Sequence, residues 1–222
     1  MQTQHFHSSR GCLSYITYDP VSKKAALIDP SEEIREQVYA DFLKEHALAL
    51  VYIVETHTHA DHVSSAKALK RLTGAQIVRH KLAPSPLRDI SVAGGEQLSL
   101  GSAVLGVLST PGHTNESISL YNGSEVFTGD ALLIGGTGRT DFQLGDSGSL
   151  YQSLHYTLEQ LPATTLVRPG HDYSGRNQSV LGDEIHTNPR MGMCESEFIH
   201  SMDAYHPPPP ELFEEAIRAN TQ

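Results

Sequence analysis

The sequence contains little cysteine and no cluster of basic residues. Cys12 and Cys194 are its two cysteines, and they lie far apart without Cys-x-x-Cys spacing, so neither a disulfide framework nor a thiolate zinc site is indicated. We expect both to be free thiols. Sixteen lysines and arginines stand against 26 aspartates and glutamates, a net charge of −10 with neutral histidines. Duplex nucleic acid and anionic membranes are therefore poor partners.

Long apolar runs are absent as well. The first residues, Met1 to His5, lack the apolar segment of a signal peptide, and no run approaches the roughly 20 residues that span a bilayer. A chain of 222 residues can bury a substantial core and lies near the upper range for one domain. We expect a cytoplasmic protein with one domain over residues 1–222, ending in a short helical tail from about residue 183.

Apolar patterning predicts strands in both halves of the chain. The predicted strands cover residues 13–18, 24–29, 50–54, 76–79, 103–108, 117–121, 125–128 and 165–168. Asp19-Pro20 and Asn122-Gly123 are turn signals, and each predicts a β-hairpin.

Helical spacing of apolar residues follows each group of strands. The first predicted helix is capped by Ser31 and has Ile34, Val38 and Phe42 on one face. The second covers residues 64–72 and ends at Gly74. The third covers residues 149–161, with Leu150, Leu154, Leu158 and Leu161 on one face, and the fourth covers residues 211–219. Strands followed by helices, twice over, predict an α/β sandwich of two mixed β-sheets with helices on the outer faces.

The motif THTHADH, residues 56–62, follows the apolar run Val51 to Val54 with one residue, Glu55, between them. It places His57, His59, Asp61 and His62 at a strand end, where their side chains can point at a common centre. Imidazole and carboxylate together favour a first-row transition metal over calcium or magnesium. The motif therefore predicts a metal centre.

Histidine or aspartate also follows three further predicted strands. His113 lies in TPGHT, Asp130 in TGDALL and His171 in RPGHDY. Strand ends cluster at one edge of a sheet, so these residues can converge on THTHADH. Seven such groups are enough for two metal ions by count alone. Asp29, at the end of an early strand, either approaches the site from behind or caps a turn.

These motifs resemble the metallo-β-lactamase superfamily, whose members have an αββα sandwich with the metal site at the sheet edge. Most members are hydrolases that use two metals and a bridging hydroxide. The continuation GDALLIGGTGRTDFQ, residues 129–143, resembles the persulfide dioxygenases of the ethylmalonic encephalopathy protein family. His171-Asp172-Tyr173 and Asn188-Pro189-Arg190 resemble the same family, whereas Thr137 stands where many relatives have cysteine.

The resemblance implies one non-haem Fe(II) per chain, bound by His57, His113 and Asp130. The implied reaction converts glutathione persulfide, O2 and water to sulfite and glutathione. The groups that would surround the ligands and tune the metal are His59, Asp61, His62, His171, Asp172 and Asp141.

Three residues are candidates for contact with the substrate. Tyr173 would donate a hydrogen bond. Arg139 would bind a glutathione carboxylate, unless it forms a salt bridge with Asp141. Arg190 either braces the tail or helps to hold the substrate.

Two other functions stay open at this point. One is a binuclear metal hydrolase of glutathione thioesters similar to glyoxalase II, and the other is a non-catalytic sulfur sensor or scaffold that binds metal. The sequence also leaves open whether the chain forms a homodimer, and whether it acts beside a sulfurtransferase (rhodanese) or a sulfide:quinone oxidoreductase.

Overall fold

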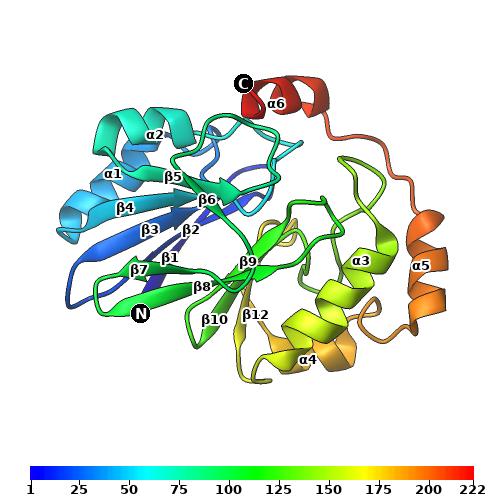
Figure 1. The fold of residues 1–222 in the computed structure, drawn as a ribbon. Helices are drawn as coiled ribbons and strands as arrows, with labels where there is room; N and C mark the ends of the chain where they lie inside the picture. The colour runs from blue at the N-terminus through cyan, green and yellow to red at the C-terminus, as the bar shows by residue number, and fades with distance from the viewer.

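The computed structural model describes residues 1–222 and contains two six-stranded β-sheets packed face to face (Figure 1). In spatial order, the first sheet consists of β1 (Gln2–His7), β2 (Leu13–Tyr18), β3 (Lys24–Ile28), β4 (Ala49–Val54), β5 (Gln76–His80) and β6 (Ile90–Val92). The second consists of β12 (Ser179–Val180), β11 (Leu166–Pro169), β10 (Glu125–Gly129), β9 (Ile118–Tyr121), β8 (Ala103–Ser109) and β7 (Gln97–Leu100).

Both sheets mix parallel and antiparallel pairing. In the first sheet, β1, β2 and β3 pair antiparallel, and β3, β4, β5 and β6 pair parallel. In the second, the parallel pair is β10 with β11, and the other neighbours are antiparallel. The two predicted hairpins are present as β2–β3 and β9–β10. The prediction of two mixed sheets in an α/β sandwich is confirmed.

Alternation along the strands divides the apolar residues between two layers. In β2, Leu13 and Tyr15 join the cluster between the two sheets, whereas Ile16 and Tyr18 join the cluster under the helices of the first sheet. Successive side chains of a strand point to opposite faces, so the continuous burial of LSYITY is what a strand covered on both sides shows.

Six α-helices cover the outer faces and the end of the chain (Figure 1). They are α1 (Glu36–Glu45), α2 (Ala66–Thr73), α3 (Ser147–Gln152), α4 (Leu181–Thr187), α5 (Glu195–Asp203) and α6 (Phe213–Asn220). α1 and α2 pack on the first sheet, and α3, α4 and α5 lie on the side of the second. None of these helices is both long and apolar enough to cross a lipid bilayer.

The first helix differs from the prediction in its start and its apolar face. It begins after Arg35, not at Ser31, whose hydroxyl accepts a hydrogen bond from the Glu33 N–H in a turn. Val38 is 45% exposed, whereas Tyr39 and Leu43 are buried. The stripe prediction was wrong at Val38, because the face of the helix that packs on the sheet runs through Tyr39, Phe42 and Leu43, and Val38 lies beside that face.

The helix predicted over residues 149–161 is not one continuous α-helix. α3 ends at Gln152 and continues as a π-helical turn over Ser153–Thr157 and a 3-10 turn over Leu158–Gln160. Its predicted face is nevertheless buried through Leu150, Leu154 and Leu158. Bonding from i to i+5 widens the turn, so leucines four residues apart stay closer to one face than in an α-helix.

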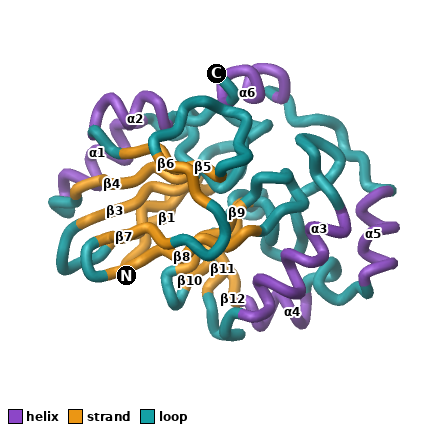
Figure 2. The backbone as a smooth tube through the Cα atoms, viewed as in Figure 1, coloured by secondary structure: helices purple, strands orange, loops and turns teal.

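The strand ends that carry the metal motifs lie on the side of the sandwich that faces α6. Loops, not helices, lie between the strands and α6 (Figure 2). β4, β8, β10 and β11 each run into one of these loops, and the motif residues follow directly. The fold thus brings together side chains that are far apart in the sequence.

Candidate metal centre

Three side chains face one centre at the edge of the sheets. They are His57 after β4, His113 after β8 and Asp130 after β10, and one ligand atom from each lies within 4.8 Å of the others. Asp130 Oδ2 lies 3.7 Å from His113 Nε2. This separation is too long for a hydrogen bond but suits two atoms that bind one metal ion at about 2.0–2.2 Å each.

Thr56 and Asp29 determine which nitrogen of the His57 ring carries the proton. Asp29 Oδ2 accepts from the Thr56 hydroxyl at 2.7 Å, so the hydroxyl oxygen offers only its lone pairs to His57 Nδ1, 2.9 Å away. Nδ1 therefore carries the proton, and Nε2 presents a lone pair to the centre. Asp29 also accepts from the Thr56 N–H, which places it behind the site.

A main-chain carbonyl determines which nitrogen of the His113 ring carries the proton. His113 Nδ1 lies 2.7 Å from Arg139 O, and a carbonyl oxygen can only accept. The proton thus sits on Nδ1, and the lone pair of Nε2 is left free for a metal ion. The loop GRTDFQ contributes to the site through this carbonyl, a role that side-chain patterns do not reveal.

Asp61 connects a second group of side chains that could bind a metal ion. Its Oδ2 lies 2.9 Å from His62 Nδ1, 2.8 Å from His171 Nε2 and 3.3 Å from Cys12 Sγ. His171 Nδ1 lies 2.7 Å from Asp130 Oδ1, so both nitrogens of this ring face carboxylates. Burial lowers the pKa of His171, but the two carboxylates outweigh it and raise that pKa well above its ordinary value.

His59 faces a different pair of carboxylates. Its Nε2 lies 3.2 Å from Asp29 Oδ1 and 3.3 Å from Glu55 Oε2, at ion-pair distance but without hydrogen-bond alignment. All three side chains are buried. His59 does not belong to the group formed by His57, His113 and Asp130. The two histidines of His-x-His are therefore placed in different environments.

The residues present fit a bound metal ion. The buried atoms His59 Nδ1 and His62 Nε2 have no protein partner. Two glycines leave room around Asp130, since a Cβ at Gly138 would lie 2.2 Å from Asp130 O and one at Gly170 would lie 2.6 Å from Asp130 Oδ1. Buried polar atoms without partners are costly, and the two imidazoles and one carboxylate of His57, His113 and Asp130 are donors that suit a first-row transition metal.

A cavity of about 320 Å³ opens onto the centre and is bordered by His113, Asp130 and His171. Tyr173 lies on its wall, 80% exposed, with its ring stacked 6.1 Å from that of His171. Thr137, the departure from the family pattern, also lines this cavity. The volume suits a small-molecule ligand.

Arg139 lines the same cavity but is engaged within the protein. Nε and Nη2 donate to the Asp141 carboxylate at 2.6 and 2.7 Å, and the guanidinium also donates to Pro207 O and Pro208 O. The guanidinium stacks 4.1 Å from the Phe142 ring centroid. The salt bridge left open by the sequence is present, and Arg139 holds a wall of the cavity.

Arg190 and Asp172 lie outside the wall of the cavity. Arg190 donates to Ser201 Oγ at 2.8 Å and stacks 5.4 Å from the ring of Tyr205, which does line the cavity. Asp172 accepts hydrogen bonds from the main chain and guanidinium of Arg176 and shapes the turn after His171. Both contacts brace the structure.

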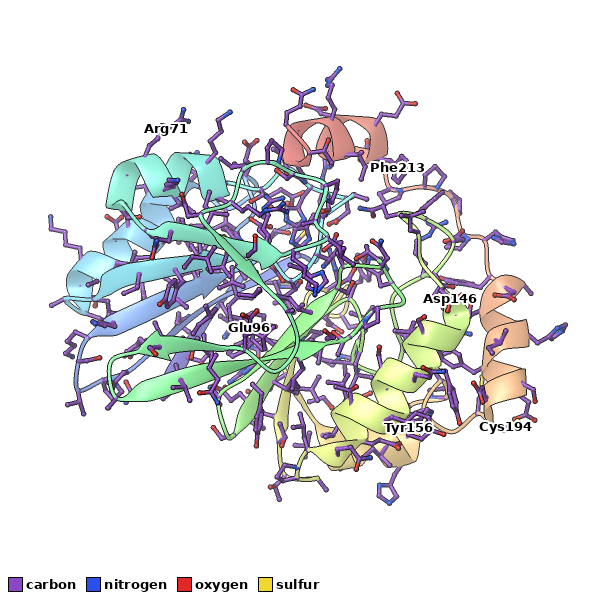
Figure 3. The ribbon with its side chains drawn as sticks, in the orientation of Figure 1. Arg71, Glu96, Asp146, Tyr156, Cys194 and Phe213 are labelled. Atoms are coloured by element: carbon purple, nitrogen blue, oxygen red, sulfur yellow. The ribbon has the colours of Figure 1, made fainter.

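The two cysteines have contrasting positions. Both are free thiols, as predicted. Cys12 is 3% exposed and joins the donors around Asp61. Cys194 lies exposed at the start of α5 (Figure 3) and does not line the cavity.

Comparisons with known proteins agree with this geometry. Residues 11–171 match the Metallo-beta-lactamase superfamily. The mitochondrial persulfide dioxygenase ETHE1 of Mus musculus is 38% identical over 98% of this chain and 86% of that protein. The crystal structure of ETHE1 from Myxococcus xanthus has 41% identity and a TM-score of 0.92, covering 100% of this chain and 98% of that one. A hydroxyacylglutathione hydrolase of Cereibacter sphaeroides is 36% identical over 75% of this chain and 66% of that protein.

The chain belongs to the metallo-beta-lactamase superfamily and, within it, to the family of the persulfide dioxygenases. Both resemblances noted in the sequence are thereby confirmed. A metal centre follows from the family and the donor groups together. The mouse relative is mitochondrial, and the cytoplasmic location expected for this chain stays a prediction.

Proposed function

We propose that this protein is an enzyme that oxidises glutathione persulfide with O2 and water to sulfite and glutathione, using one Fe(II) ion per chain. The observation that carries the proposal is the separation of the donors into two groups. His57, His113 and Asp130 share one centre, whereas Asp61 and His171 are bound to each other. Family membership supports the same reaction class.

Two histidines and one carboxylate are the ligand set of many iron-dependent oxygenases. When bound, Fe(II) in such a set supplies open positions at which a persulfide sulfur and O2 can meet. The chain contributes the orientation of the ligands, because Thr56 and Arg139 O direct the protons of both histidines away from the centre.

The cavity would hold the glutathione part of the substrate. Its walls include Tyr173, Phe142 and the prolines 207 and 208. No protein group accepts a hydrogen bond from the Tyr173 hydroxyl, so it is available to the substrate. Arg139 acts through the proline carbonyls, which it holds in place.

The alternative function is a binuclear hydrolase of glutathione thioesters. It is favoured by the presence of Asp61, His62 and His171, which form a second set of donors together with Cys12. It is disfavoured by the contacts of His171, because both nitrogens of this ring lie at hydrogen-bond distance from carboxylates of the protein. A homodimer and a link to a sulfurtransferase or quinone oxidoreductase stay predictions.

The test combines a metal count with two assays on the same sample. Protein from iron-grown cells is analysed for metals, then placed in an oxygen electrode with freshly made glutathione persulfide, and in parallel with a glutathione thioester. We expect about one iron per chain, persulfide-dependent oxygen consumption and no thioester cleavage. Two zinc ions per chain, or thioester cleavage without oxygen consumption, would replace the proposal with the hydrolase.

A further inference from the structure

The amide side chain of Asn220 is buried against the loop that carries THTHADH. Asn220 is the last residue of α6 and is 5% exposed. Its Nδ2 donates to His59 O and to His62 O, each at 2.9 Å, and its Oδ1 accepts from the Ser64 N–H at 2.9 Å. One side chain from the end of the sequence thus makes three hydrogen bonds to the main chain of the metal loop.

The main chain of Asn220 reaches the same loop by a second route. Its carbonyl oxygen accepts from Arg79 Nη1 at 3.1 Å, and the buried Arg79 has Nη2 3.9 Å from Glu55 Oε1. The other oxygen of Glu55 lies 3.3 Å from His59 Nε2. Both the position of the loop and the surroundings of the His59 ring therefore depend on where α6 ends.

The metal loop has no helix or strand of its own to hold it. Main-chain hydrogen bonds hold the loop near its two ends, at Thr56 and Val63. Its middle is held by side chains from elsewhere: the Thr58 N–H donates to Glu116 Oε1, and Gln143 Nε2 donates to Thr58 O. Asn220 supplies the corresponding contacts at His59 and His62. Buried carbonyls without donors are unfavourable, so removing the amide would let this part of the loop move.

α6 is also fastened at its other end. The ring of Phe213, labelled at the start of α6 in Figure 3, lies 4.7 Å from the ring of Phe142 in the loop that borders the cavity. The helix therefore contacts the cavity loop with its first residue and the metal loop with its last.

We propose that Asn220 is a positioning residue of the metal centre, and that α6 serves to fasten the loop bearing His57, His59, Asp61 and His62. This inference rests on the proposed iron site, since it assumes that the loop holds the metal. Asn220 does not touch the metal or the substrate. It acts by fixing the main chain of the loop from which the ligand His57 and the neighbouring side chains His59, Asp61 and His62 project.

The test compares Asn220→Ala and Asn220→Asp with Arg218→Ala. The aspartate keeps the size and one acceptor of asparagine but loses both N–H donors, and Arg218 is an exposed residue of the same helix. For each full-length protein we would measure Fe(II) and Co(II) affinity by competition with a chelator, hydrogen exchange of peptides covering 55–65, and melting temperature.

Both Asn220 variants should bind Fe(II) and Co(II) about 10-fold more weakly, the size typical of groups behind metal ligands. In both Asn220 variants, amide hydrogen exchange should become faster in peptides covering residues 55–65, while peptides of the central strands stay protected. Arg218→Ala should behave like the parent protein in all three measurements. Unchanged metal affinity in both variants, equal loss in Arg218→Ala, or faster exchange throughout the chain would overturn the inference. If the parent consumes no oxygen with persulfide, the proposed function fails, while Co(II) affinity and exchange still decide the role of Asn220.

Discussion

Asp29 Oδ2 accepts the hydroxyl proton of Thr56 at 2.7 Å, and this one contact decides which nitrogen of His57 can bind a metal. Asp29→Asn would reverse it, because the amide can donate to Thr56 Oγ1. The hydroxyl would then donate to His57 Nδ1, leaving the proton on Nε2. We expect Fe(II) affinity to fall about 10- to 100-fold.

Ser14→Ala is the matched control for Asp29→Asn. The Ser14 hydroxyl donates to the main-chain oxygen of Asp29 at 2.7 Å and is equally buried, but it does not contact Thr56. This variant should lose stability and keep its metal affinity. Equal Fe(II) affinities in the two variants, measured by chelator competition, would contradict the role of Asp29.

His57 and His59 should respond differently to substitution. His57→Ala removes one of three ligands and should abolish iron binding together with persulfide-dependent oxygen consumption. His59→Ala should retain much of the iron and lose part of the activity, about 10- to 100-fold at most. Iron content and the oxygen electrode measure both effects. Loss of all iron in His59→Ala would make His59 a ligand.

Tyr173→Phe should lower the turnover number about 10-fold, the lower end of the loss expected when one hydrogen bond of about 1.5–3 kcal/mol to a charged group is removed. Iron content and melting temperature should not change, since no protein group bonds to the hydroxyl. Tyr156→Phe, at a residue 69% exposed and outside the cavity, is the control. Loss of iron in Tyr173→Phe would instead assign Tyr173 a structural role.

Arg139→Lys should raise KM for glutathione persulfide several-fold and leave iron content unchanged. Lysine cannot reproduce the paired contact with Asp141 together with the bonds to the two proline carbonyls. The cavity wall would loosen, whereas the Arg139 carbonyl that holds His113 would remain. Arg88→Lys, at an arginine that donates to Ala83 O outside the cavity, should leave KM unchanged.

Glu125 should make stability depend on pH. Burial raises its pKa, but hydrogen bonds from Thr3 and Arg168 outweigh burial and hold the pKa below the ordinary 4.5. The folded pKa is therefore the lower one, so this carboxylate stabilises the fold above pH 4.5 and the contribution is lost as pH falls through the folded value.

Glu125→Gln tests this dependence. It should cost about 1–3 kcal/mol at neutral pH, because Arg168 loses a charged partner, and the difference from the parent should shrink in acid. Melting temperatures between neutral pH and the acid range measure the effect. Glu45→Gln, at an exposed glutamate, should run parallel to the parent throughout.

Much of the architecture followed from the sequence. Alternation in Leu13 to Tyr18 and the turn at Asn122-Gly123 predicted strands and hairpins that the structure contains. Strand ends bring ligands to one edge, so His57, His113 and Asp130 could be expected to meet. These features are local or periodic, and such patterns are readable along a chain.

The tertiary structure alone decided how the donors are used. Counting residues could not show that both nitrogens of His171 face carboxylates, those of Asp61 and Asp130. It could not show either that Arg139 donates to Asp141 and to the carbonyls of Pro207 and Pro208. A side chain has more than one possible partner, and only its three-dimensional neighbours select one. The same holds for Asn220, whose amide meets the metal loop across some 160 positions of sequence, a contact that no local pattern records.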